Sequence, residues 1–235
     1  MLKTSVNKSI VFNSGPVTLV GGGQASTEDL SEALKIAPMC VAADGGAALA
    51  LAAQVPIEAL IGDFDSVTAA SLSQIPPDRQ FKVSEQETTD FDKALCLIDA
   101  PLVIGVGFLG GRIDHQLAAF STLVRFAHRP CVLLGAEQIV LVAPPEMALA
   151  TQAGEIVSIY PMAPVHGSST GLEWPIDGLR LDPTGRIGTS NLARGPATLS
   201  MDSPNALLIL PRRLILPVVQ SLMRSDAVGW PLRAE

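Results

Sequence analysis

Aspartates recur in this 235-residue chain after short apolar runs. They are Asp44, Asp63, Asp65, Asp90, Asp92 and, after a glycine-rich turn, Asp114. Carboxylates brought close together repel one another unless a cation neutralises them. Oxygen ligands without a group of His and Cys are those that Mg²⁺ prefers. The pattern therefore predicts a magnesium site, although Asp also favours turns and helix N-caps, so any single one of these residues could be purely structural.

The most specific acidic segment is Gly-Asp-Phe-Asp-Ser at residues 62–66. In an extended loop, side chains two residues apart point to the same side. Asp63 and Asp65 would then face one cation, while Phe64 packs inward. We therefore expect both carboxylates to bind the same ion.

Glycines follow several of the apolar runs, at residues 21–23, 45–46 and 110–111. Backbone N–H groups at such turns, and at the helix N-termini behind them, can bind phosphate. None of these segments matches the P-loop or the dinucleotide-binding fingerprint. Arg112 could clamp a phosphate through two hydrogen bonds, or could be an ordinary surface arginine. Lys93 is similarly ambiguous, and His115 could equally be a packing or capping residue.

Apolar strands alternate with helix-like stretches over the first 145 residues. We expect strands at 17–20, 39–43, 57–61, 81–83, 102–106, 131–134 and 139–142, and helices at 27–35, 47–54, 90–98 and 113–126. Ser26 and Asp29 resemble a capping box for the first helix. Such alternation predicts a mainly parallel sheet covered on both faces. Ligands bind beyond the carboxyl ends of strands in such sheets, which is where the aspartates lie.

The pattern changes after Pro144 and Pro145. Short strand candidates separated by turn residues follow at 155–160, 171–174, 179–181, 187–190, 198–201 and 207–210. Their regular spacing is typical of an antiparallel sandwich or barrel. A short amphipathic helix could follow Arg212, although Pro217 argues against it. We therefore predict an α/β domain over 1–145 and an all-β sandwich domain over 146–235.

Composition excludes several classes of protein. Hydrophobic residues make up 48% of the chain, so a sizeable core is possible and general disorder is excluded. The net charge of −7 and the 4% aromatic content argue against nucleic-acid binding. No apolar run reaches the roughly 18 to 20 residues of a membrane span. The dispersed cysteines Cys40, Cys96 and Cys131 indicate buried thiols in a reducing compartment, so we expect a cytoplasmic protein without a membrane partner.

Several of these segments together resemble the thiamine pyrophosphokinase family. In the family's order they are Ala-Asp-Gly-Gly-Ala at 43–47, Gly-Asp-Phe-Asp-Ser at 62–66, Gln-Glu-Thr-Thr-Asp-Phe-Asp-Lys-Ala-Leu at 86–95 and Gly-Gly-Arg-Ile-Asp-His at 110–115. Less specific C-terminal matches are Gly-Leu-Glu-Trp-Pro-Ile at 171–176 and Gly-Thr-Ser-Asn at 188–191. The resemblance covers roughly residues 17 to 211.

The resemblance implies an N-terminal α/β domain, a C-terminal β-sandwich and a homodimer with its sites between subunits. It implies Mg²⁺-ATP as the donor and thiamine as the acceptor. By motif position, the metal ligands would be Asp63, Asp65 and Asp90, and the catalytic residues would be these three with Arg112 and Asp114. Nucleotide binding would fall to Asp44, Gly45, Gly46, Gln86, Thr89, Asp90, Lys93, Gly111 and Arg112. Thiamine binding would fall to Asp114, His115, Ser190 and Asn191.

The implied reaction moves a diphosphate group from ATP to the hydroxyl of thiamine, with in-line attack on the β-phosphorus and release of AMP. The aspartate that accepts the hydroxyl proton is left open. Two alternatives remain: a hydroxymethylpterin-type acceptor on the same phosphate machinery, and a nucleotide- or thiamine-binding regulator without turnover. Some family members place a tryptophan against thiamine in the last strand, where this chain has Ala-Leu-Leu-Ile at 206–209. The stacking residue is therefore open, and Trp174 could instead pack in the core.

Overall fold

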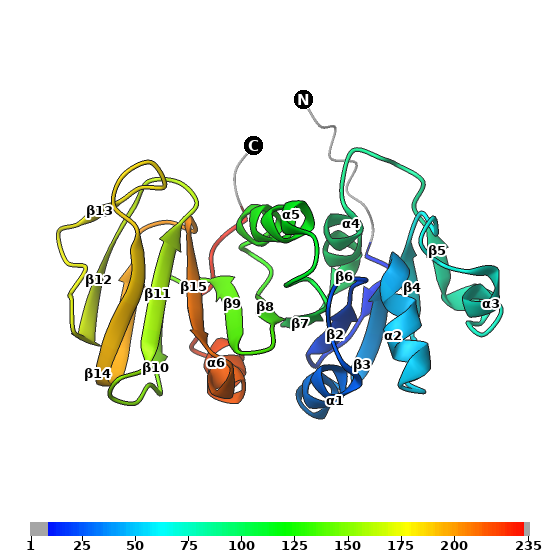
Figure 1. Ribbon diagram of the computed structural model, residues 1–235, viewed down its shortest axis with the longest axis horizontal. Helices are drawn as coiled ribbons and strands as arrows, with labels where there is room; N and C mark the ends of the chain where they lie inside the picture. The colour runs from blue at the N-terminus through cyan, green and yellow to red at the C-terminus, as the bar shows by residue number, and fades with distance from the viewer. Residues whose placement is uncertain (1–8, 233–235) are drawn as a thin grey trace. The chain divides into compact units, whose positions relative to one another are not determined.

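The computed structural model describes residues 9–232, and the chain divides into two compact units between Ala119 and Phe120. Figure 1 shows the elements of both units. The division falls inside helix α5 (Ile113–Arg125). It therefore lies upstream of the change in sequence pattern at Pro144 and Pro145, which marks where the helices give way to strands.

The first unit contains a parallel sheet with the strand order β7-β2-β3-β4-β5. Its strands are β2 (Val17–Val20), β3 (Met39–Ala43), β4 (Ala59–Gly62), β5 (Gln80–Lys82) and β7 (Val103–Val106). All residues of β2, β4 and β7 are buried, because both faces of the sheet are covered. The predicted parallel sheet is confirmed. A separate parallel pair, β1 (Val11–Phe12) with β6 (Ile98–Asp99), was not predicted.

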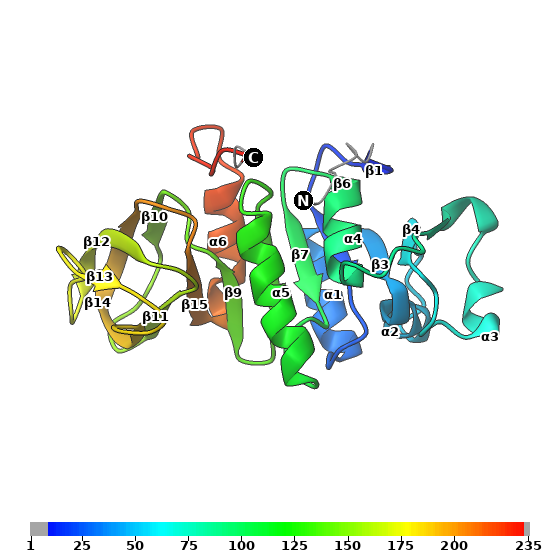
Figure 2. The ribbon, with the colours of Figure 1, turned by 90° about the horizontal axis from the view of Figure 1, so that it is seen from above.

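Helices cover both faces of this sheet. They are α1 (Thr27–Ile36), α2 (Ala47–Ala52), the short α3 (Ala69–Leu72) and α4 (Asp90–Leu97), with 3₁₀ turns η1 (Asp44–Gly46) and η2 (Pro77–Arg79). Figure 2 shows α1 and α2 against one face and α4 against the other. The predicted capping box of α1 is present, with Asp29 N–H donating to Ser26 Oγ at 3.1 Å and Ser26 N–H donating to Asp29 Oδ2 at 2.8 Å.

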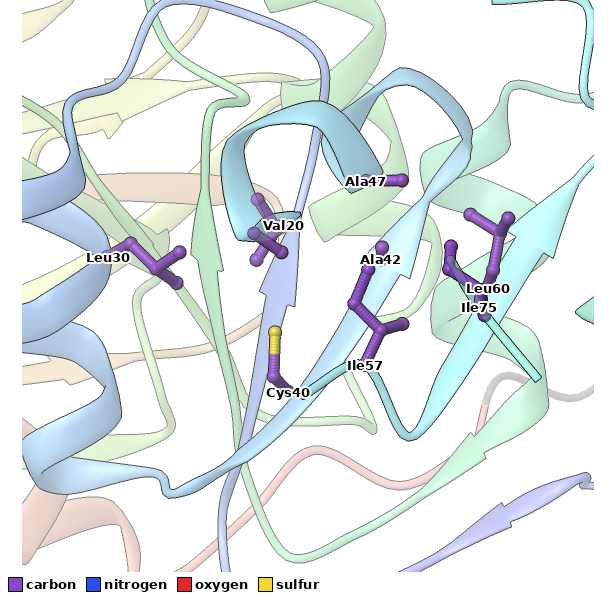
Figure 3. Packing of buried hydrophobic residues seen from close by; sticks show 9 residues of the cluster. Val20, Leu30, Cys40, Ala42, Ala47, Ile57, Leu60 and Ile75 are labelled. Carbon is purple, nitrogen blue, oxygen red and sulfur yellow. The ribbon is translucent and has the colours of Figure 1, made fainter. Parts of the chain in front are cut away.

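A cluster of small and branched side chains fills the space between α1, α2 and the sheet. Its buried members are Val20, Leu30, Cys40, Ala42, Ala47, Ala50, Ile57, Leu60 and Ile75, most of which Figure 3 labels. Alanines at the sheet–helix contact let α2 approach the strands closely. The loops that follow β3 and β4 are thereby held on a rigid base.

The second unit is built from antiparallel strands. β8 (Cys131–Leu134) pairs with β9 (Gln138–Val142), β9 with β15 (Ala206–Pro211), and β15 with β11 (Ile156–Pro161). β11 continues to β14 (Gly188–Met201), which also pairs with β10 (Glu146–Leu149) and β12 (Val165–Leu172), while β13 (Arg180–Leu181) pairs with β12. The predicted change to antiparallel strands is confirmed, and the closure into a sandwich stays a prediction.

Three features of this unit differ from the expectation. The candidates at 187–190 and 198–201 form the single strand β14, which runs on through Gly195 and Pro196 although these two residues resemble a turn in the sequence. The candidate at 171–174 is strand only at Gly171 and Leu172, the end of β12, and residues 166–170 of that strand carry no apolar signal. β10 was not predicted.

The chain ends with 3₁₀ turn η3 (Arg212–Leu214) and helix α6 (Ile215–Leu222). Pro217 is the third residue of α6, where a backbone N–H has no partner within the helix, so the proline is tolerated. Beyond α6, Trp230 donates its Nε1–H to the carbonyl of Ala143 at 2.9 Å. No helix within residues 9–232 is long and apolar enough to cross a membrane.

The three cysteines are free thiols. Cys40 and Cys131 are buried, and Cys96 is half-buried. Burial, with a smaller effect of the charge of Glu58, raises the pKa of Cys40 to about 12. Burial also raises the pKa of Cys131. These two thiols are packing residues, as the composition predicts.

Candidate active site

Three aspartates from two neighbouring loops converge at the carboxyl end of the parallel sheet. Asp44 follows β3, and Asp63 and Asp65 follow β4, which pairs with β3. One carboxylate oxygen of each lies within 4.8 Å of the others. Strand ends that neighbour each other in a parallel sheet bring their loops together, so this convergence follows from the fold.

Asp44 is the most buried member of the group, with 3% of its surface exposed. Its backbone is left-handed, with φ of 41°, as 3₁₀ turn η1 begins. Its Oδ2 accepts a hydrogen bond from Ser66 N–H at 3.1 Å, and its Oδ1 has no hydrogen-bond partner among the described residues. Burial, and secondly the charge of Asp90, raise the pKa of Asp44. A buried carboxylate oxygen without a donor is matched to a cation, so these oxygen donors fit Mg²⁺.

Asp63, Phe64 and Asp65 form a turn, so the expected extended loop is wrong. Asp65 N–H donates to Asp63 Oδ1 at 3.2 Å, and Phe64 has a φ of 69°. The inward packing of Phe64 is confirmed, because its ring lies against the buried cluster of Figure 3. A left-handed aromatic residue costs about 1–3 kcal/mol, and the packing of its side chain helps to hold the turn.

Gln86 and Lys93 contact the other oxygen of Asp63. Gln86 Nε2 donates to Asp63 Oδ2 at 2.7 Å, and Lys93 Nζ lies 3.6 Å from the same oxygen. The hydrogen bonds from Asp65 N–H and Gln86 lower the pKa of Asp63. Asp63 is therefore ionised at neutral pH, as a metal ligand must be.

Helix α4 places Asp90 and Lys93 one turn apart. Thr89 caps the helix in a capping box with Asp92, whose N–H donates to Thr89 Oγ1 at 3.2 Å. Lys93 Nζ lies 3.1 Å from Asp90 Oδ1. Burial alone would lower the pKa of Lys93, but the hydrogen bond to Asp90 and the nearby acidic groups outweigh it and raise this pKa.

The glycine-rich turn before α5 brings a second group of predicted residues together. Gly110 and Gly111 are left-handed, with φ of 77° and 72°. The Arg112 guanidinium forms a two-pronged ion pair with Asp114, with Nε 3.1 Å from Oδ1. Both side chains are exposed, as is that of His115. Among the described residues, the contacts of this pair do not join it to the aspartate group.

Two of the predicted thiamine residues, Ser190 and Asn191, lie on β14 in the second unit, whereas Asp114 and His115 lie at the start of α5 in the first. Ser190 is exposed and left-handed, with φ of 60°, at a β-bulge against β11. Asn191 is buried, and its Nδ2 donates to the carbonyl of Trp174 at 2.6 Å while its Oδ1 accepts from Trp174 N–H at 3.2 Å. The core-packing interpretation of Trp174 is wrong, because 57% of this residue is exposed. Asn191 therefore holds the backbone of an exposed aromatic residue.

Ser66 links two loops of the site, a role that was not predicted. Its N–H holds Asp44, and its hydroxyl donates to Asp65 Oδ1 at 2.8 Å. One residue thus links the loops after β3 and β4. The signal was its position directly after the second aspartate of the 62–66 segment, where Ser favours a turn.

Asp44→Asn should stabilise the metal-free protein at neutral pH. Ionising the buried Asp44 costs folding free energy once the pH exceeds its ordinary pKa of 3.8, and this cost is complete above the raised folded-state pKa. Asparagine tolerates the left-handed backbone and carries no charge. In a chelator, urea unfolding should give a free energy about 1–2 kcal/mol above wild type at pH 7, and the gain should vanish as the pH falls toward 4.

The matched control for this variant is Asp78→Asn, which removes an exposed aspartate of η2. It should leave the free energy of unfolding nearly unchanged at both pH values. A pH-independent gain for Asp44→Asn would contradict the assignment of the gain to removal of a buried charge.

Residues 30–134 match the family model described as "Thiamin pyrophosphokinase, catalytic domain". Thiamine pyrophosphokinase 2 of Oryza sativa subsp. japonica is 28% identical over 155 residues, which cover 57% of this chain and 58% of that protein. Thiamin pyrophosphokinase 1 of Caenorhabditis elegans is 28% identical over 156 residues, covering 56% and 60%. The chain thus spans about three fifths of the length of these curated relatives.

Solved structures share the fold at low sequence identity. Thiamin pyrophosphokinase from Candida albicans superposes with a TM-score of 0.73 at 14% identity, covering 87% of this chain and 93% of that one. Thiamin pyrophosphokinase from Geobacillus thermodenitrificans gives a TM-score of 0.69 at 22% identity, covering 91% and 100%. The family model, the curated relatives and the solved structures thus agree in what this chain is similar to: each is a thiamine pyrophosphokinase by its description.

Proposed function

We propose that this protein transfers a diphosphate group from ATP to the hydroxyl of thiamine, giving thiamine diphosphate and AMP. The observation that carries the proposal is the convergence of Asp44, Asp63 and Asp65, with a buried Asp44 oxygen that lacks a donor. The similarity to thiamine pyrophosphokinases supports ATP and thiamine as the substrates. In-line attack on the β-phosphorus is the step that releases AMP.

Mg²⁺ would be held by Asp63 and Asp65 together with Asp44 or the predicted Asp90, and would neutralise negative charge on the phosphate oxygens. Asp63 is the ligand whose position is best fixed, because Asp65 N–H, Gln86 and Lys93 contact both of its carboxylate oxygens. Asp90 is held one helical turn from Lys93. The protein groups therefore orient these ligands without help from the ion.

Arg112 is the proposed phosphate clamp. Its pairing with Asp114 holds the guanidinium plane at the start of α5, and both side chains are open to solvent. A phosphate can therefore approach the guanidinium from solvent. Gly110 and Gly111 give the preceding turn its left-handed course, which non-glycine residues rarely adopt.

The acceptor site would use the exposed face near Ser190. Thiamine carries a permanently charged aromatic ring, and the exposed indole of Trp174 offers a surface for such a cation. We further propose that residues 1–145 bind ATP and the metal, and that residues 146–235 form a β-sandwich for thiamine and for a homodimer with shared sites. The cytoplasmic location stays a prediction.

A coupled assay of AMP release tests the function. The protein is incubated with ATP and MgCl₂ and with thiamine, a hydroxymethylpterin or no acceptor, and each reaction is repeated with excess chelator. We expect acceptor-dependent AMP only with thiamine, and none in chelator. AMP release with the pterin alone would identify the other acceptor, and binding of ATP or thiamine without AMP would identify a regulator. Either result would overturn the proposal.

Asn191→Ala should weaken thiamine binding more than it slows turnover. The change removes both hydrogen bonds that hold the Trp174 backbone, so the indole loses its fixed position. We expect the KM for thiamine to rise about tenfold, while the KM for ATP changes within about twofold. Steady-state kinetics with each substrate varied in turn measure both values.

The matched control is Thr184→Ala, which removes a hydroxyl of the second unit that donates to Asp182 Oδ1, two residues earlier in the same turn, at 2.7 Å. Its thiamine KM should equal that of wild type. An equal rise in the two KM values of Asn191→Ala would contradict a local role at the acceptor site.

A further inference from the structure

Lys93 is a buried cation between two acidic side chains. Only 3% of its side chain is exposed, compared with 35% for that of Asp90 and 11% for that of Asp63. Its Nζ lies 3.1 Å from Asp90 Oδ1 and 3.6 Å from Asp63 Oδ2. Burying an ammonium is costly unless carboxylates compensate it. The two carboxylates therefore compensate the buried charge of Lys93.

These contacts join two separate parts of the site. Asp90 is the first residue of α4, the helix that also contains Lys93. Asp63 lies in the loop that follows β4. The ammonium thus ties the start of α4 to the turn that carries Asp63 and Asp65. It also sits among acidic groups that would otherwise repel one another, since the charge of Asp90 is felt at Asp44 as well.

The burial of Lys93 separates its role from phosphate binding. To reach a phosphate in solvent, the ammonium would have to leave Asp63 and Asp90 without their counter-ion. The ammonium of Lys93 instead faces the carboxylates of Asp63 and Asp90. Gln86, which is exposed and contacts the same oxygen of Asp63, can stay in place when a substrate enters.

We propose that Lys93 is a positioning residue, a built-in cation that holds Asp63 and Asp90 in place before a divalent ion binds. The proposal deepens the proposed function, since it concerns the same carboxylates. In the metal-free protein, Lys93 supplies part of the charge that Mg²⁺ supplies when bound. Without Lys93, the site should depend on a divalent ion for its stability.

The first test compares Lys93→Met with Lys82→Met. Methionine keeps the apolar stem of Lys93 without its charge, and Lys82 is an exposed lysine at the end of β5. Urea unfolding is followed by far-ultraviolet circular dichroism in chelator and in about 10 mM MgCl₂, with NaCl added to equalise ionic strength. We expect the unfolding equilibrium constant of Lys93→Met in chelator to rise on the order of 10- to 100-fold. Lys82→Met should match wild type.

The dependence on Mg²⁺ distinguishes positioning by charge from simple packing. Mg²⁺ should recover at least about half of the loss in Lys93→Met on a logarithmic scale, and should stabilise wild type much less. Lys93→Arg keeps the charge and should lie closer to wild type in chelator. Equal stabilisation of Lys93→Met and wild type by Mg²⁺ would overturn the proposal.

A double variant keeps the proposal testable if Lys93→Met does not fold in chelator. Lys93→Met combined with Asp90→Asn removes one charge of each sign, so the repulsion left by the single change disappears. We expect the double variant to unfold with an equilibrium constant at least about fivefold smaller than that of Lys93→Met. A double variant no more stable than the single one would overturn the proposal. These measurements involve no turnover, so they stand apart from any failure of the thiamine assay.

Discussion

Asp65→Asn should reduce turnover on the order of 100-fold or more, equivalent to about 3 kcal/mol of activation free energy. The change preserves size and removes one negative charge from the group that Asp44, Asp63 and Asp65 form. Asparagine favours turns, and the Asp65 backbone N–H still donates to Asp63, so the loop should keep its shape. Turnover is measured at saturating ATP and thiamine over a range of Mg²⁺ concentrations. Thiamine affinity should change little.

The matched control is Asp78→Asn, which removes an exposed aspartate of the same unit and should retain wild-type turnover. Asp63→Asn should act in the same direction as Asp65→Asn. Its interpretation is less direct, because Asp63 also receives the Gln86 amide and faces Lys93. Turnover within a few-fold of wild type for both site variants, with unchanged Mg²⁺ dependence, would refute the assignment of these carboxylates.

Gly46→Ala should prevent the first unit from folding. A Cβ at this position would lie 2.0 Å from the carbonyl oxygen of Val20 and 2.9 Å from the backbone nitrogen of Gly21. Both obstacles are backbone atoms of a buried strand and the turn after it, so neither can move aside as a flexible side chain would. We expect the free energy of unfolding to fall by about 4 kcal/mol or more. Soluble yield and the far-ultraviolet circular dichroism spectrum measure the outcome.

Gly45→Ala provides the matched control one residue earlier in the chain. Its Cβ would meet the Ser66 side chain at 3.4 Å, which is an ordinary contact. This variant should therefore fold. A free energy of unfolding for Gly46→Ala within about 1 kcal/mol of the wild-type value would contradict the close approach of η1 to β2.

The parallel sheet was predictable because its strands are continuous apolar runs. The limits expected for β2 at 17–20 and for β3 at 39–43 agree with the observed ones. Strands buried on both faces carry this signal at every position. Ser26 and Asp29 were equally readable, since a capping box depends on residues only three positions apart.

The polar strands of the second unit were not predictable in the same way. The first half of β12 contains His166, Gly167, Ser168 and Ser169, and its pairing with β14 brings together residues far apart in the sequence. β14 passes through Gly195 and Pro196, whose local preference is for turns. In both strands, long-range pairing outweighs local propensity.

The site was predictable as a location and less so in its internal contacts. Acidic residues at the ends of neighbouring parallel strands must meet, which placed Asp44 beside Asp63 and Asp65. The burial of Lys93 was not predictable, because a lysine is usually exposed and its partner Asp63 lies on another element. The hydrogen bonds between Asn191 and the Trp174 backbone were not predictable either, because they join residues that are far apart in the sequence.

The division of the chain into two units has an optical consequence. Both tryptophans, Trp174 and Trp230, and the single tyrosine, Tyr160, lie after residue 119, so the unit that carries the acidic group contains only phenylalanine as an aromatic chromophore. Intrinsic emission excited at the red edge of the protein band therefore originates wholly from the second unit. The first unit could open or close around a nucleotide without changing a local emitter. A tryptophan introduced at an exposed position of α3 would allow the first unit to be followed by fluorescence.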